Sequence, residues 1–103
     1  MTIQFNTDKT IQGDDKRKIH FTTLIEQKLK RFNDAVTRIE LHLSDENGEK
    51  GGPNDIRCLL EARIAGKQPI AVKEQAATLD QAVEGAVAKM ETSLSKIFDK
   101  MAN

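Results

Sequence analysis

"VTRIELHLSDENGEKGGPNDIRCLLEARIAG", residues 36–66, consists of two alternating segments on either side of a polar stretch rich in glycine. Alternation with a period of two is typical of a half-buried strand, because successive side chains point to opposite faces of a sheet. The apolar positions of both segments are expected to face the core: Ile39, Leu41, Leu43, Ile56, Cys58, Leu60, Ala62 and Ile64. The intervening polar positions are expected on the open face: Arg38, Glu40, His42, Arg57, Glu61 and Arg63.

The polar stretch between these segments half-resembles a loop that binds phosphate. Such a loop needs Gly-Lys followed by Ser or Thr at the start of a helix, so that backbone N–H groups converge on the anion. Here Lys50 precedes the glycines, Pro53 lacks a donor, and a strand follows. Asn47-Gly48 and the glycine pair are instead typical of a hairpin connection. The sequence therefore predicts two antiparallel strands joined by an acidic connection.

The chain after residue 66 predicts a third strand and a long helix. "GKQ" at 66–68 is a tight connection, and "PIAVKEQAA" at 69–77 places Ile70 and Val72 inward and Lys73 on the open face. "TLDQ" at 78–81 matches a capping box, in which a Thr hydroxyl satisfies a backbone N–H of the first turn. The apolar face of the helix that follows is expected to comprise Val83, Val87, Met90, Leu94, Ile97, Phe98 and Met101.

The chain before residue 36 predicts a short strand and another helix. "TIQFN" at 2–6 alternates, with Ile3 and Phe5 on one side. "GDD" at 13–15 supplies a break and carboxylates that favour a helix N-terminus, and "FND" at 32–34 closes the helix. Its apolar stripe is expected to comprise Ile19, Phe21, Leu24, Ile25, Leu29 and Phe32.

Two helices with single apolar stripes can bury them against a sheet with one apolar face only if both cover the same side. The sequence therefore predicts an α+β fold, a two-layer sandwich in the order β-α-β-β-β-α with a four-stranded sheet. We expect residues 1–103 to form one domain, because two halves of about fifty residues would each bury too little apolar surface.

Composition limits the classes of function. Sixteen basic and sixteen acidic residues cancel, but residues 16–31 carry six Lys or Arg against one Glu, and residues 44–55 carry four acids against one Lys. The single cysteine cannot form an internal disulfide, and the chain has neither a secretory signal nor an apolar run of about eighteen residues. We expect a cytoplasmic protein without a membrane segment.

No residue pattern predicts catalysis or a metal site. His20, His42 and Cys58 do not stand at metal-ligand spacing, and the alternation places His42 and Cys58 on opposite faces of the sheet. Neither a Ser-His-Asp order nor a Gly-x-Ser-x-Gly elbow is present. We expect no catalytic residue, no cofactor, no metal and no small-molecule substrate.

Basic side chains on both helices are the remaining feature. Arg17, Lys28 and Arg31 lie off the first apolar stripe, and Lys89, Lys96 and Lys100 recur along one face of the second helix. If both helices cover one side of the sheet, these rows are expected to be neighbours in a single stripe that follows a phosphate backbone. The alternative is that these lysines serve solubility only. All four aromatic residues are Phe at apolar positions, which favours structured RNA over stacking on unpaired bases.

These features in combination resemble a known family. The element order, the alternation in "VTRIELHL", the hairpin and above all "TLDQAVEGAVAKMETSLSKIFDK" (78–100) are similar to the ribosome hibernation-promoting factors. The family is also called ribosome-associated inhibitor or ribosomal subunit interface protein, and this chain resembles its short form.

The resemblance implies a domain shaped like double-stranded-RNA-binding domains, with no catalytic activity. It also implies binding to the small ribosomal subunit, in the channel used by messenger and transfer RNA, and silencing of translation under stress. The basic positions of the family pattern fall on Lys89, Lys96 and Lys100, and in the first helix on Lys28 and Arg31. The implied partners are thus the small subunit and its ribosomal RNA. The alternative is a protein-interaction module that docks a partner on the open sheet face through Arg57, Leu59, Arg63 and Lys73.

Overall fold

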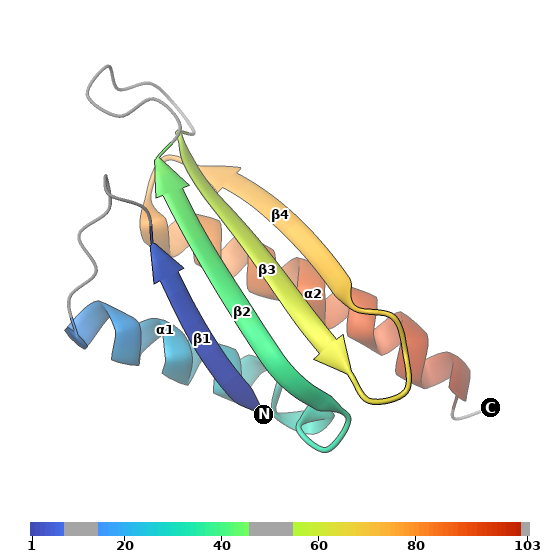
Figure 1. Cartoon of the computed structure of the whole chain (residues 1–103). Coiled ribbons are helices and arrows are strands. Elements are labelled where there is room, and N and C mark those ends of the chain that lie inside the picture. Colours follow the sequence, from blue (N-terminus) through green and yellow to red (C-terminus); the bar gives the residue numbers. More distant parts are fainter. Residues whose placement is uncertain (8–14, 46–54, 102–103) are drawn as a thin grey trace.

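The computed structural model describes residues 1–7, 15–45 and 55–101 (Figure 1). The elements follow the chain as β1 (Thr2–Thr7), α1 (Asp15–Lys28), the 3-10 turn η1 (Lys30–Phe32), β2 (Val36–Asp45), β3 (Ile56–Ile64), β4 (Ile70–Ala76) and α2 (Leu79–Met101). The predicted order β-α-β-β-β-α is confirmed.

The four strands form one mixed sheet in the order β1-β2-β3-β4. β1 runs parallel to β2, and α1 lies in the crossover that a parallel pair requires. β2 and β3 are antiparallel, with Leu41 opposite Leu60 and Leu43 opposite Cys58. This pairing confirms the prediction of two antiparallel strands on either side of the acidic stretch, although residues 46–54 lie outside the described residues.

Both helices cover the same side of the sheet (Figure 1), as the two-layer prediction requires. The core between the layers contains the apolar positions of β2 and β3 that alternation predicted, except Ile56, which is half-buried and packs against it. Ile70 and Val72 of β4 pack against this core at the sheet edge. The fully buried side chains come from every layer and include Phe21, Ile25, Ile39, Leu41, Cys58, Leu60, Val83, Met90 and Leu94.

A β-bulge interrupts the alternation at the start of β2. The register with β3 shifts between Val36 and Arg38, which leaves Thr37 as the extra residue. The Thr37 hydroxyl donates a hydrogen bond to the carbonyl oxygen of Arg63 at 3.2 Å. Because of the bulge, Val36 and Ile39 both face the core although they are three positions apart, an odd spacing that would otherwise put them on opposite faces.

The first helix differs from its prediction at Ile19, which is 65% exposed. Ile19 lies two residues before the buried Phe21, and residues two apart on a helix point in nearly opposite directions. Ile19 therefore does not belong to the apolar stripe. Leu29 and Phe32 are buried as predicted, but they follow α1, in the turn that contains η1.

The second helix matches its prediction. The backbone N–H of Gln81 donates to the Thr78 hydroxyl oxygen at 3.1 Å, so the threonine half of the capping box is formed. Val83, Val87, Met90 and Leu94 are buried, and Ile97 and Phe98 pack against the core. The carboxylates predicted to cap the first helix include Asp14, which lies outside the described residues together with the side chain of Met101.

Candidate nucleic-acid interface

The six predicted RNA-binding residues all belong to the helical layer. Arg17 and Lys28 lie on α1, Arg31 lies in η1, and Lys89, Lys96 and Lys100 lie on α2. Lys28, Arg31, Lys89 and Lys96 are exposed, whereas Arg17 is half-buried and has an interaction partner. The side chain of Lys100 is outside the described residues.

Arg31 connects η1 to α2. Its guanidinium donates a hydrogen bond to the hydroxyl oxygen of Ser95, the neighbour of Lys96 in sequence. The guanidinium carbon also lies 4.4 Å from the centre of the Phe32 ring, a distance typical of a cation–π contact. Phe32 in turn stacks on Phe98 with ring centres 5.6 Å apart. These contacts fix the charge of Arg31 beside the second half of α2.

Lys89 is held at the edge of the sheet. Its ammonium group donates to the backbone carbonyl of Lys73 at 2.7 Å and lies 3.3 Å from Oε1 of Glu74. Lys96 follows seven residues later, two helical turns along the same flank of α2. This flank therefore faces β4 rather than α1.

Glu74 was not predicted as part of any site. It alternates with Val72 and Ala76 on the helix-covered side of β4 and lies opposite Cys58 of β3. Gly85 of α2 makes room for it, because a Cβ at that position would lie 2.7 Å from Glu74 Cγ. Burial, and secondarily the Glu74 charge, raises the pKa of the Cys58 thiol to about 12. The thiol is therefore a poor nucleophile and metal ligand.

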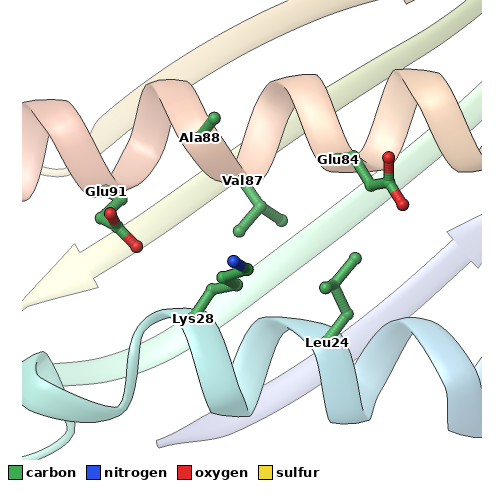
Figure 2. A pocket seen from close by; sticks show the side chains of 6 residues that line it. All are labelled: Leu24, Lys28, Glu84, Val87, Ala88 and Glu91. Carbon is green, nitrogen blue, oxygen red and sulfur yellow. The ribbon is translucent and has the colours of Figure 1, made fainter.

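The expectation that the basic rows of both helices form one stripe is wrong for the first half of α2. Lys28 lies in a groove between α1 and α2, opposite Glu84 and Glu91 of α2 (Figure 2). Lys89 lies on the other flank of α2, in contact with β4. Acidic side chains of α2 thus separate Lys28 from Lys89, whereas Arg31 is hydrogen-bonded to α2.

The histidines and the cysteine lie apart, as predicted. His20 Nε2 lies 3.9 Å from Asp80 Oδ1 and joins α1 to the start of α2, and Cys58 is buried in the core. His42 lies on the open sheet face, where its Nε2 is 3.7 Å from Glu40 Oε2. Glu61 lies directly opposite Glu40. Glu40, His42 and Glu61 each offer one atom that could ligate a metal ion, and these three atoms lie within 4.8 Å of one another.

This group could not be found from sequence spacing, because Glu40 and Glu61 meet only through the register of β2 and β3. Glu40 is already paired with a cation, since Arg38 Nε lies 3.0 Å from Oε1. A hydrogen-bonded row continues from Arg38 through Gln4 to Asn6, whose Nδ2 lies 3.5 Å from His42 Nδ1. The group is therefore part of a polar network on the open face.

The residues of the alternative interface lie on that same face. Arg57, Leu59 and Arg63 of β3 point away from the helices, and Lys73 of β4 lies opposite Leu59. Within the part of the chain that the structure describes, no helix is long and apolar enough to cross a membrane.

The model of the sigma 54 modulation protein / S30EA ribosomal protein family matches residues 7–102. A search of curated proteins finds no significant match.

Two solved structures share the fold. The N-terminal domain of Protein Y from Thermus thermophilus is 18% identical, with a TM-score of 0.75 over 94% of this chain and 99% of that chain. A ribosomal subunit interface protein from Coxiella burnetii is 19% identical, with a TM-score of 0.74 over 96% of this chain and 99% of that chain. With the family match extending over nearly the whole sequence, the chain belongs to the sigma 54 modulation protein / S30EA ribosomal protein family, and the resemblance to hibernation-promoting factors is confirmed.

Proposed function

We propose that this chain is a cytoplasmic, non-enzymatic regulator of translation. It binds the small ribosomal subunit through basic side chains of its helical layer and inactivates or protects idle ribosomes under stress. The family match over residues 7–102 carries this proposal, because the family is named after a ribosomal protein. The likeness in fold to a ribosomal subunit interface protein supports it.

The arrangement of charge favours contact with the phosphate backbone over recognition of bases. Arg31 and Lys96 are exposed beside Ser95, and Lys89 lies two turns before Lys96 on the same helix. Lys and Arg side chains in such a row neutralise phosphates and release counterions, a gain that does not depend on base sequence. The phenylalanines Phe5, Phe21, Phe32 and Phe98 pack in or against the core and cannot stack on bases.

Co-sedimentation with purified small subunits over a series of salt concentrations tests the proposal. If about five Lys or Arg side chains contact phosphates, the logarithm of the association constant should fall linearly with the logarithm of the salt concentration, with a slope of about −4. The double variant Lys89→Glu/Lys96→Glu should abolish association. Lys89→Glu also places a second carboxylate beside Glu74, so the single variant Lys96→Glu should be measured as well. Circular dichroism should show an intact fold for both variants.

The double variant Arg63→Glu/Lys73→Glu provides the matched control on the open sheet face. It changes the net charge by the same amount and should leave association nearly unchanged. The alternative, a protein-interaction module on the sheet face, predicts the opposite pattern. Association that is insensitive to salt, or lost only in the sheet variant, would refute the proposal.

A further inference from the structure

A groove runs between α1 and α2 on the outer side of the helical layer. Leu24 and Lys28 line it from α1, and Glu84, Val87, Ala88 and Glu91 line it from α2. Figure 2 shows Leu24 and Lys28 reaching from α1 toward α2, with Val87 pointing back toward them and the two glutamates on either side of Val87. The groove has a volume of about 300 Å³, at the lower end of ligand pockets, so it can take one or two side chains.

The floor of the groove is apolar and its rim is charged. Val87 and half-buried Leu24 form the floor, and Glu84, Glu91 and Lys28 form the rim. Among the residues that the structure describes, none of the three rim side chains has a hydrogen bond or an ion pair. Two carboxylates against one ammonium give the rim a net negative charge. The groove therefore attracts a cation and disfavours phosphate.

The spacing of the two glutamates constrains the occupant. They are seven positions apart on α2, which is about 10 Å along the helix axis. In a polyproline II segment, residues three apart lie on the same side, about 9 Å from each other. Two basic residues three apart in an extended segment can thus reach both carboxylates at once, while their aliphatic stems lie over Leu24 and Val87.

Arginine fits this groove better than lysine. Its planar guanidinium pairs with a carboxylate through two parallel hydrogen bonds, and its aliphatic stem can lie along an apolar floor. We propose that the groove between α1 and α2 docks an extended, arginine-bearing segment of a protein partner, with arginines three residues apart on Glu84 and Glu91. This site goes beyond the RNA-binding surface proposed above, because it assigns a protein to the flank of α2 opposite Lys89.

Fluorescence anisotropy with two labelled probes tests this inference on the full chain. The first probe is a peptide of four Arg-Pro-Leu repeats, and the second is a short RNA duplex. The groove variant Glu84→Gln/Glu91→Gln should bind the peptide at least tenfold more weakly than the unchanged chain. The matched variant Glu26→Gln/Asp34→Asn removes two exposed acids outside the groove and should stay within twofold.

The RNA probe separates this site from the proposed function. The groove variant should bind the duplex at least as tightly as the unchanged chain, since it loses two acids, whereas Lys96→Glu should weaken RNA binding and leave peptide binding intact. If the groove variant and the matched variant Glu26→Gln/Asp34→Asn bind the peptide equally, net charge alone explains the interaction and the proposal is overturned. Absence of peptide binding by the unchanged chain would also overturn the proposal. Loss of RNA binding in the groove variant would overturn it as well, because the groove would then be an RNA site.

Discussion

The ammonium group of Lys89 on α2 lies 3.3 Å from Oε1 of Glu74 on β4. The same ammonium group donates to the backbone carbonyl of Lys73, so the lysine satisfies one carbonyl of the edge strand β4 as well as pairing with the acid. A phosphate that approaches Lys89 meets a carboxylate already in place. We therefore expect the pair to reduce the affinity of this flank of α2 for anions.

Replacing Glu74 with Gln should strengthen binding to an RNA duplex. The change removes one repulsive charge and frees Lys89 to contact a phosphate, which we expect to raise the affinity by about threefold to tenfold at low salt. The Lys89 side chain is about half exposed, so loss of the pair should lower the free energy of unfolding by less than about 1 kcal/mol. Anisotropy and urea denaturation measure the two effects.

Glu61→Gln is the control for Glu74→Gln, because it removes one acid from the open sheet face, away from α2. Its effect on RNA affinity should be smaller. Equal gains in the two variants would show that net charge alone is responsible and that Lys89 is not restrained by Glu74.

Replacing Gly85 with Ala tests the packing of Glu74 under α2. The added methyl would lie 2.7 Å from Glu74 Cγ and force this side chain to move. Alanine favours the helix interior over glycine by about 1 kcal/mol, so displacement of Glu74 should cancel most of that gain. In a Glu74→Ala background the same change should stabilise the protein by about 1 kcal/mol. A double-mutant cycle of Gly85→Ala and Glu74→Ala, followed by urea denaturation, measures the difference between the two backgrounds. If the changes in unfolding free energy simply add, the contact between Gly85 and Glu74 is contradicted.

The strand pattern was predictable because it is local. In residues 39–43 and 56–64 the alternation decides which side chains face the core, and a shift by one residue would expose them. Val36 reaches the core only because of the bulge at Thr37. The capping of α2 by Thr78 is local as well.

The candidate site was harder to predict because it depends on how the elements pack. The sequence places Lys28 and Lys89 on helices, but the packing of α1 and α2 decides that Glu84 and Glu91 lie between them. The contact between Arg31 and Ser95 joins residues 64 positions apart in the chain. Glu74 could not be assigned a place from the sequence, because only the packing of α2 on β4 shows that Gly85 leaves space for this carboxylate on the helix-covered side.

The exposure of Ile19 predicts a low cost for its replacement. Ile19→Ala removes a side chain that is 65% exposed, and we expect a loss of less than about 0.5 kcal/mol in unfolding free energy. Ile25→Ala, on the same helix, creates a cavity in the core and should cost about 2–5 kcal/mol. Urea denaturation of both variants makes the comparison. If Ile19→Ala lowers the free energy of unfolding nearly as much as Ile25→Ala, Ile19 is part of the buried apolar stripe after all.

The raised pKa of Cys58 predicts that stability falls in alkali. Burial, and secondarily the Glu74 charge, raises the pKa of the thiol from 9.0 to about 12 in the folded protein. Between these values the unfolded chain loses the thiol proton and the folded chain keeps it, so the unfolded state binds fewer protons. The free energy of unfolding should then fall above about pH 9, by up to about 1.4 kcal/mol per pH unit from this group.

Because lysines also titrate in alkali, the measurement compares the unchanged chain with Cys58→Ala by urea denaturation between pH 8 and 10.5. The free energy of unfolding should fall more steeply for the unchanged chain above pH 9, and the two should run parallel below pH 8.5. Parallel curves over the whole range would mean that the thiol ionises in the folded protein as readily as in the unfolded chain. In that case Cys58 would not be shielded from solvent by the packing of β3 and β4 against α2.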